Sequence, residues 1–385
     1  MDRKKYLVVG AGFSGAVIAR KLAENGKNVL VIDKRSHIAG NCYTKRDANT
    51  NVMVHKYGPH IFNTNNKEVW EYVNSYGKLK PFKNKVIANT EKGVFSMPMN
   101  LLTINQFFKT KLKPSEVESF LKQKQKKKEN PKDFEEQALA FLGEELYYNF
   151  FYGYTKKQWG CEPKELPASI LKRLPIRFNY DDNYYNSKYQ GIPENGYTEI
   201  IENILKHKNI TIELGIVYNK SDNKSYEHVF YTGAIDSYLD YKFGRLGYRT
   251  VFFKEEIHDG DFQGNAVINY CEEDIPFTRV HEHKHFAPWE NHEKTIVLTE
   301  FSKETVDKDE PYYPKRLKPD IAKLNSYVTY AESLEENVSF VGRLATYRYL
   351  DMEKVIKEAL DYATYFLENK KENTIFKGAI FSNKI

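Results

Sequence analysis

Three glycines and one acid near the amino terminus have the types and spacing that bind a dinucleotide. Gly10, Gly12 and Gly15 form a G-x-G-x-x-G turn, and Asp33 follows Gly15 by 18 residues. In such a turn the first glycine bends the chain, the second admits a pyrophosphate to the backbone amides, and the third lets helix and strand pack closely. The acid accepts a hydrogen bond from an adenosine ribose hydroxyl and disfavours a 2′-phosphate.

The segments around these residues must form a strand, a helix and a second strand. Residues 6–9 and 29–32 are short apolar runs typical of strands buried in a parallel sheet. Residues 16–23 place apolar side chains at helical spacing. This context makes the motif specific, because an isolated glycine motif is weak evidence. Two alternatives are a removable secretory leader over residues 1–19 and a glycine turn without a ligand.

The segment after Asp33 favours FAD over NAD. Residues 34–41 form a small-residue turn of the kind that lies beside the pyrophosphate and ribityl chain in flavoproteins. Near the carboxyl terminus, residues 338–352 predict a strand ending at Gly342, followed by an arginine and a new helix, which is a second anion-binding arrangement. We call this segment the carboxyl-terminal return. A dehydrogenase that binds NAD has no need of it. Lys34 and Arg35 leave open a 2′-phosphate and hence NADP.

Composition limits the class of protein. A chain of 385 residues is long enough for two or three domains, and no run of 18 apolar residues predicts a membrane span. The net charge of +6 and the many aromatic residues are compatible with nucleic-acid binding, but a nucleotide ligand explains them with fewer partners. The three cysteines are widely spaced, predict no metal site, and fit a reducing cytoplasm.

The remaining patterns predict the fold class, which is α/β. Helical spacing dominates residues 65–76, with Asn65 as the expected cap, and residues 101–152, including a solvated lysine-rich face. Residues 210–214 and 228–232 predict further buried strands. Alternating polar and apolar residues predict a separate antiparallel sheet from strands at 248–253, 265–270, 278–283 and 295–301.

We therefore expect a discontinuous Rossmann-like FAD-binding domain with an inserted helical domain and an antiparallel β-sheet domain. The expected FAD-binding parts are residues 1–64, 200–240 and 331–385; the mainly helical substrate domain is 65–185, with a lid around 165–177; the sheet domain is 186–199 plus 241–330.

Several segments resemble one enzyme family. YGPHIFNT at 57–64 resembles YGPHIFHT of bacterial UDP-galactopyranose mutases, and GYTKKQW at 153–159 matches the family's GYTxKQW, which lines its uridine site. The resemblance extends over roughly residues 5–365. It implies ring-contracting isomerisation of UDP-galactopyranose to UDP-galactofuranose, for cell-surface polysaccharide. The reaction would run through a sugar adduct at N5 of reduced FAD, without net redox change.

The resemblance also implies residue roles. Arg173, between prolines on the lid, and Arg279 would stabilise the departing diphosphate, and His60 would lie near the flavin edge. Tyr154 and Trp159 would hold uracil. The substrate-binding residues expected are Asn63, Asn84, Phe150, Phe151, Tyr154, Thr155, Trp159, Arg173, Tyr184, Asn269, Arg279, Tyr313 and Tyr349. The cofactor-binding residues expected are Gly10, Gly12, Phe13, Ser14, Gly15, Asp33, Lys34, Gly40, Asn41, His60, Gly233, Gly342, Arg343, Tyr349, Asp351 and Met352.

The sequence departs from the family pattern at a few positions. Asn63 stands where the mutases most often have His, Ala39 where Gly is commoner, and Phe277 where Tyr is commoner. The first departure leaves open a related sugar, with a 2-acetamido or a 6-deoxy group. An FAD-dependent oxidoreductase is the other alternative. The expected partners are a UDP-sugar, NAD(P)H or a reductase as reductant, and a second copy in a homodimer, but no nucleic acid.

Overall fold

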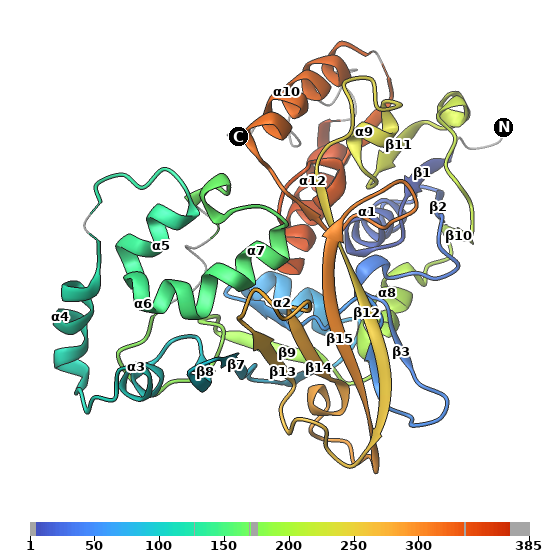
Figure 1. Ribbon diagram of the computed structural model, residues 1–385. Coiled ribbons are helices and arrows are strands. Elements are labelled where there is room, and N and C mark those ends of the chain that lie inside the picture. Colours follow the sequence, from blue (N-terminus) through green and yellow to red (C-terminus); the bar gives the residue numbers. More distant parts are fainter. Residues whose placement is uncertain (1–4, 127, 169, 171–175, 335, 370–385) are drawn as a thin grey trace.

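A five-stranded parallel sheet forms the amino-terminal core of the computed structural model, which describes residues 5–126, 128–168, 170, 176–334 and 336–369 (Figure 1). Its strands come from three separate parts of the chain. In spatial order they are β10 (Ile210–Leu214), β2 (Val29–Asp33), β1 (Tyr6–Val9), β11 (His228–Tyr231) and β17 (Val338–Phe340). This order confirms the discontinuous Rossmann-like domain. The glycine turn follows β1, the central strand.

Small apolar residues allow the helices to pack closely on this sheet. Helix α1 (Phe13–Glu24) buries Ala16 and Ala19 completely, and it contacts α8 (Gly196–Leu205) and α12 (Met352–Asn369). Strand β10 is an exception to the expected burial, because it lies at the sheet edge and its residues are largely exposed. Our interpretation of residues 210–214 as a buried strand was therefore wrong about burial but right about the strand.

The expected antiparallel sheet is present and has seven strands. Their order is β16 (Tyr313–Pro314), β12 (Tyr248–Asp259), β15 (Lys294–Glu304), β14 (Arg279–Glu282), β13 (Val267–Tyr270), β7 (Val86–Thr90) and β8 (Gly93–Met97). The last two strands come from the part of the chain expected to be mainly helical, and β7 pairs with β13 in parallel. The sheet therefore continues into the helical part.

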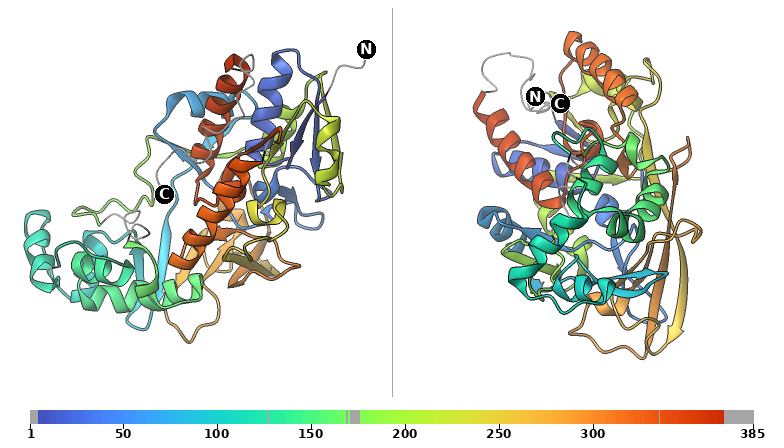
Figure 2. Two further views of the ribbon diagram at one scale, coloured as in Figure 1. Left: turned by 90° about the horizontal axis from the view of Figure 1, so that it is seen from above. Right: turned by 60° about the vertical axis from the view of Figure 1, so that its left-hand side comes forward.

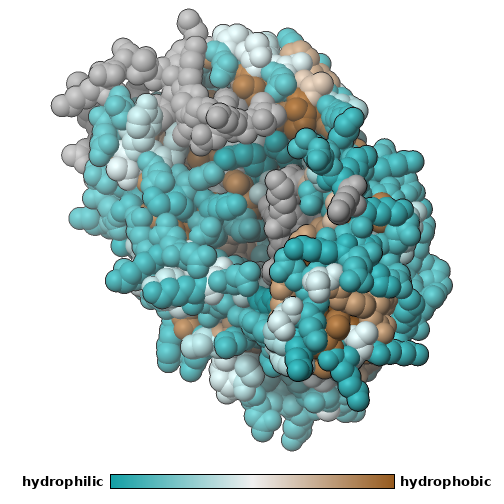
Figure 3. Space-filling view, turned by 90° about the vertical axis from the view of Figure 1, so that its left-hand side faces the viewer, coloured by the Kyte–Doolittle hydropathy of each residue, from teal (hydrophilic) through white to brown (hydrophobic). Residues whose placement is uncertain are grey.

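The helical part projects away from the parallel sheet (Figures 1 and 2). It contains α3 (Leu101–Phe108), α4 (Pro114–Lys124), α5 (Phe134–Leu142), α6 (Glu144–Tyr147), a π-helical turn (Tyr148–Tyr152) and α7 (Gly153–Trp159). Lys124, Lys126 and Lys128 pair with glutamates at the surface. Figure 3, which views the molecule from this side, shows a largely hydrophilic surface. The lysine-rich segment is thus a solvated face, as predicted.

The smaller elements correct several boundaries. Helix α2 (Lys67–Asn74) is capped by Asn66, whose side chain accepts a hydrogen bond from Val69 N (3.2 Å), so the predicted cap at Asn65 was wrong by one residue. Asn65 instead accepts a bond from Lys188 N (2.8 Å). Strand β9 (Tyr189–Pro193), expected within the antiparallel domain, pairs with β5 (Phe62–Thr64) and β6 (Leu79–Pro81).

Two further segments complete the fold. Helix α10 (Lys318–Ser333) buries Leu324 and Tyr327 in one cluster with Tyr231 and Phe340 of the parallel sheet, although we expected residues 241–330 in the antiparallel domain. The hairpin of β3 (Thr44–Arg46) and β4 (Met53–His55) packs Val52 and Val54 onto the antiparallel sheet. Short helices α9 (Ile235–Tyr238) and α11 (Gly342–Ala345) follow β11 and β17. In the described part of the chain, no helix has the length and apolar character needed to cross a bilayer.

Gly15 should tolerate no side chain, because a Cβ atom there would lie 1.9 Å from the carbonyl oxygen of Gly10. We predict that Gly15→Ala lowers the melting temperature strongly. Gly26→Ala is the control, since its Cβ would enter open space and the cost would be only the left-handed backbone strain of about 1–2 kcal/mol. Equal melting temperatures for the two variants would contradict the close packing of α1 on the glycine turn.

Candidate functional site

Three backbone segments meet at the carboxyl edge of the parallel sheet. A Cβ built on Gly40 would lie 3.4 Å from Gly12 Cα, and one built on Gly342 would lie 2.4 Å from Ser14 Oγ. Gly342 also has a φ of +89°, and Ala39 has a φ of +72°, which explains why glycine is commoner at position 39. The glycines thus let the segments approach closely, and together they form a cradle that suits a pyrophosphate beside the start of α1.

The Asp33 carboxylate closes the adenosine end of this cradle. Its Oδ2 accepts a hydrogen bond from Ala11 N (2.8 Å), and its Oδ1 accepts one from Arg35 N (2.9 Å). Both Lys34 and Arg35 pair with Glu310, at 2.8 and 2.9 Å. Glu310 engages both side chains and offsets one of their two positive charges, which makes the pair less disposed to bind a 2′-phosphate. The geometry favours a cofactor with a free ribose hydroxyl, as FAD has.

The carboxyl-terminal return connects the cradle to a pair of phenols. Arg343 donates from Nε and Nη2 to Leu350 O (3.1 and 2.6 Å). Its guanidinium lies 5.7 Å from the ring centre of Tyr313 and 5.4 Å from that of Tyr349. The two rings stack at 5.5 Å with an interplanar angle of 15°. A cofactor-side arginine therefore supports two residues expected to bind substrate.

The remaining expected cofactor residues lie around the same cradle. Phe13 is buried at the start of α1, and Asn41 accepts a bond from Arg35 (2.9 Å). Gly233 lies just after β11, and Asp351 immediately precedes α12, which begins at Met352. The cradle, the ribose acceptor and the return together fit the phosphates and adenosine of FAD.

The pair of Arg279 and Glu300 lies at the centre of the expected substrate cleft. Arg279 Nη2 lies 2.6 Å from Glu300 Oε1 and 2.9 Å from Oε2, and His281 Nε2 lies 3.0 Å from Oε2. Burial alone would lower the pKa of Arg279, but Glu300 raises it above its usual range. Burial acts to raise the pKa of Glu300, yet Arg279 and His281 bring it down to about 2. Both groups are therefore charged at neutral pH.

Arg279 is the member of the pair that a ligand can reach. Its side chain is 28% exposed, whereas that of Glu300 is 2% exposed. Tyr154, Tyr184 and Tyr313 lie close enough to Arg279 for its charge to affect their pKa values. Burial raises all three, that of Tyr313 to about 12, so the phenols stay protonated and can donate hydrogen bonds. A cation surrounded by phenol donors suits a diphosphate.

Unsatisfied polar atoms line the same cleft. Among the described residues, no hydrogen-bond partner exists for the buried atoms His60 Nδ1, Asn84 Oδ1 and Asn269 Oδ1. Buried polar groups are normally paired, so these three atoms are available to a polar ligand that enters this region. Burial lowers the pKa of His60 to about 4, with the Arg343 charge contributing, which keeps its imidazole neutral. Asn269 lies directly opposite Arg279 in the β13–β14 register.

The aromatic segment is divided between the cleft and the core. Tyr154 is near Arg279 and Glu300, whereas Trp159, roughly 140° further round the helix, packs beside the helical core. Phe150 is 3% exposed and packs against Phe95 and Phe107, so its ring does not reach the cleft as we expected. Phe151 and Thr155 are also buried.

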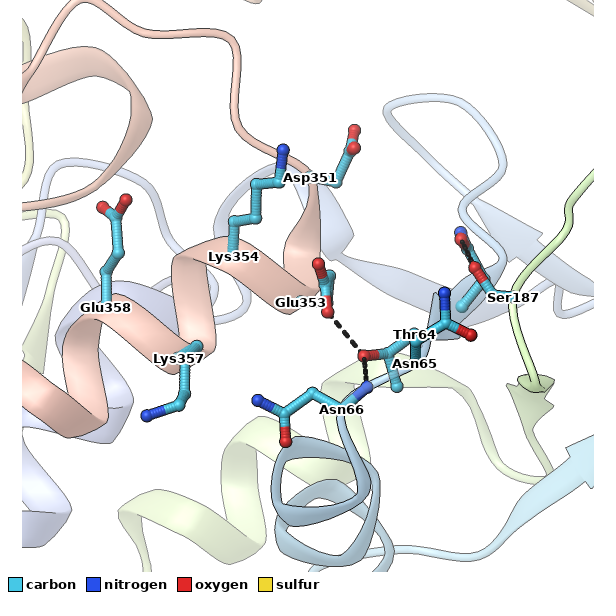
Figure 4. A pocket seen from close by; sticks show the side chains of 10 residues that line it. Thr64, Asn65, Asn66, Ser187, Asp351, Glu353, Lys354, Lys357 and Glu358 are labelled. Atoms are coloured by element: carbon cyan, nitrogen blue, oxygen red, sulfur yellow. Dashed lines mark hydrogen bonds between the residues drawn. The ribbon is translucent and has the colours of Figure 1, made fainter. Parts of the chain in front are cut away.

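Asn63 is among the residues that line a pocket of about 610 Å³. Figure 4 shows this pocket between the start of α12 and the segment at residues 64–66. Asn63 Oδ1 accepts a bond from Ser187 Oγ (3.0 Å), and its Nδ2 donates to Ile61 O (3.3 Å). Asp351 also lines this pocket, and its negative charge acts to raise the pKa of Tyr185, which follows Tyr184 in the sequence. The pocket is polar and is lined by Asn63, Thr64, Asn65, Asn66, Ser187, Asp351, Glu353, Lys354, Lys357 and Glu358.

Sequence reasoning missed Glu300, although a signal was present. Ile296, Leu298 and Glu300 occupy alternate positions of β15, and all three are buried. An acid at such a position implies a buried cationic partner. Arg173 and most of the expected lid lie outside the described residues.

Comparisons with known proteins identify relatives of this chain. A family model described as UDP-galactopyranose mutase matches residues 149–349, and one described as an NAD(P)-binding Rossmann-like domain matches residues 8–76. A probable UDP-galactopyranose mutase of Klebsiella pneumoniae is 53% identical over 98% of this chain and 99% of its own. A dTDP-fucopyranose mutase of Escherichia coli is 51% identical over 96% of this chain and all of its own.

A solved structure shows the same fold. The crystal structure of a reduced UDP-galactopyranose mutase covers 98% of each chain with a TM-score of 0.76 at 14% identity. Putrescine oxidase bound to putrescine gives a TM-score of 0.58 at 11% identity, over 95% of this chain and 99% of its own. The Rossmann-like match, the family match and the cradle identify FAD as the cofactor. Given the extent of the sequence matches, this chain belongs to the UDP-galactopyranose mutase family.

Proposed function

We propose that this mutase converts UDP-galactopyranose to UDP-galactofuranose and is active when its FAD is reduced. The observation that carries the proposal is the cleft-facing Arg279, held by buried Glu300 and surrounded by phenols next to the FAD cradle. A diphosphate bound there would place the attached sugar toward His60 and the cofactor. The product would supply galactofuranose for cell-surface polysaccharide.

The chain itself would bind, orient and neutralise charge. Reduced flavin would supply the nucleophile for the anomeric carbon, so the protein needs no nucleophilic side chain. As the bond from sugar to UDP breaks, negative charge grows on the diphosphate. Arg279 would neutralise it, and Tyr184, Tyr313 and Tyr349 would donate hydrogen bonds to its oxygens. We assign Arg173 the same task from the lid.

The sugar is the part of the substrate on which the named relatives differ. The two relatives differ in both sugar and base, since one is named for UDP-galactopyranose and the other for dTDP-fucopyranose. The family model and the Klebsiella pneumoniae relative are both named for UDP-galactopyranose. We therefore place galactose first, with its 2-acetamido and 6-deoxy analogues as alternatives.

An FAD-dependent oxidoreductase is the second candidate, because putrescine oxidase shares the fold. A small-amine oxidase would not need an arginine ringed by phenols, which favours the mutase. The reductant of the flavin, NAD(P)H or a reductase, and a homodimeric state in the cytoplasm are further parts of the proposal.

The conversion itself tests the function. We predict that the purified protein is yellow with noncovalent FAD, and that it forms UDP-galactofuranose under anaerobic conditions after reduction with dithionite. The oxidised protein should form none. Product is measured by chromatography at equilibrium and by NMR. Full activity of the oxidised protein, or consumption of one NADH per product, would instead indicate an oxidoreductase.

Asn63 provides a test of sugar choice. We predict that the natural protein accepts 2-acetamido or 6-deoxy analogues of UDP-galactose. In Asn63→His, the kcat/KM for these analogues relative to that for UDP-galactose should fall about tenfold, because one altered contact changes discrimination by that order. Ser187→Ala is the matched control, since it removes the hydrogen bond to Asn63 but keeps the amide. An unchanged order of preference in Asn63→His would leave Asn63 without a part in specificity.

A further inference from the structure

The half-buried side chain of Lys157 joins helix α7 to the β13–β14 hairpin. Its Nζ donates to Tyr270 O and to Phe277 O, both at 2.9 Å. Tyr270 is the last residue of β13, and Phe277 lies two residues before β14 begins at Arg279. One ammonium group therefore closes both ends of the turn at residues 271–277.

The two elements that Lys157 joins carry different parts of the expected substrate site. The hairpin carries Asn269 and Arg279, which face each other in its register. Helix α7 carries Tyr154, Thr155 and Trp159, and it lies over the antiparallel sheet in contact with β15 (Figure 1). The separation of helix and hairpin thus sets the distance from the base-binding to the diphosphate-binding side chains.

One further contact packs α7 against the turn of the hairpin, and another anchors α7 to β12 of the same sheet. A Cβ built on Gly153 would lie 2.4 Å from Cys271 O, so the helix backbone touches the turn. At the other end of α7, Arg249 donates from Nε to Gln158 O (3.0 Å) and from Nη2 to Lys157 O (3.2 Å). Lys157 is the side chain of α7 that binds the hairpin backbone directly.

The neighbouring lysine makes a different kind of contact. Lys156 pairs at the surface with Glu162 (2.8 Å) and Glu273 (2.6 Å). Surface pairs of this kind contribute about 0–1 kcal/mol. Lys157, in contrast, is buried enough that the pKa of its ammonium falls to about 8, and its bonds are to backbone carbonyls. Its loss would leave two carbonyls without that donor.

We propose that Lys157 is a positioning residue that fixes the span between the nucleobase subsite on α7 and the diphosphate subsite on the β13–β14 hairpin. The inference rests on the proposed function, because only a nucleotide must occupy both subsites at once. When two subsites are held at the right separation, binding of one ligand part raises the effective concentration of the other. A ligand that uses a single subsite gains nothing from the fixed span.

The test compares Lys157→Met with Lys156→Met in the oxidised holoprotein. Calorimetric titrations use UDP, which spans both subsites, and inorganic pyrophosphate and uridine, which each occupy one. Lys157→Met should weaken UDP binding about tenfold and change pyrophosphate and uridine binding less than about threefold. Lys156→Met should leave all three unchanged. Gly153→Ala, which forces the helix from the turn, should reproduce the selective loss.

Other outcomes overturn the inference. If Lys157→Met weakens pyrophosphate or uridine binding as much as UDP binding, the lysine maintains one subsite and not the span. If UDP binding is unchanged in both Lys157→Met and Gly153→Ala, the span is not fixed here. Should Lys157→Met fail to fold, Gly153→Ala decides between these results. Failure of the natural protein to bind UDP at all would refute the proposed function instead.

Discussion

The buried pair of Glu300 and Arg279 is the interaction on which the candidate site depends. Glu300 is almost completely buried and engages the guanidinium through both carboxylate oxygens, while Arg279 keeps its other edge toward the cleft. Removing one partner of a buried pair typically costs about 3–5 kcal/mol, because the other charge is left uncompensated. The sheet thus holds one cation in a fixed orientation before any ligand arrives, which is the condition for stabilising charge that develops during a reaction.

The rest of the structure places other groups around this cation. The parallel sheet brings the glycine turn, residue Gly40 and the Gly342 return to one edge, where the cofactor cradle forms. Arg343 then links the cradle to Tyr313 and Tyr349. Glu310, which lies three residues before Tyr313, pairs with Arg35 at the adenosine end of the cradle. Cofactor and substrate sites therefore share one framework, so damage to either should affect both.

The sequence predicted those features that depend on neighbouring residues. The glycine turn between a strand and a helix and the alternating strands of the antiparallel sheet are local patterns, and the structure confirms both. Contacts between distant segments could not be predicted. From the sequence we expected Phe150 to contact the substrate. Only the fold shows that its ring packs against Phe95 and Phe107. Helix α10 likewise joins the parallel sheet through Tyr327, a contact that no local pattern encodes.

Arg279→Lys tests most directly whether the fixed guanidinium, and not charge alone, serves the reaction. Lysine keeps the positive charge but cannot pair with Glu300 through two parallel bonds. If the orientation matters chiefly as UDP leaves, kcat of the reduced enzyme should fall about a hundredfold or more, while the Kd for UDP should rise less than about tenfold. Retention of near-natural turnover by Arg279→Lys would contradict the account, because a mobile charge would then suffice.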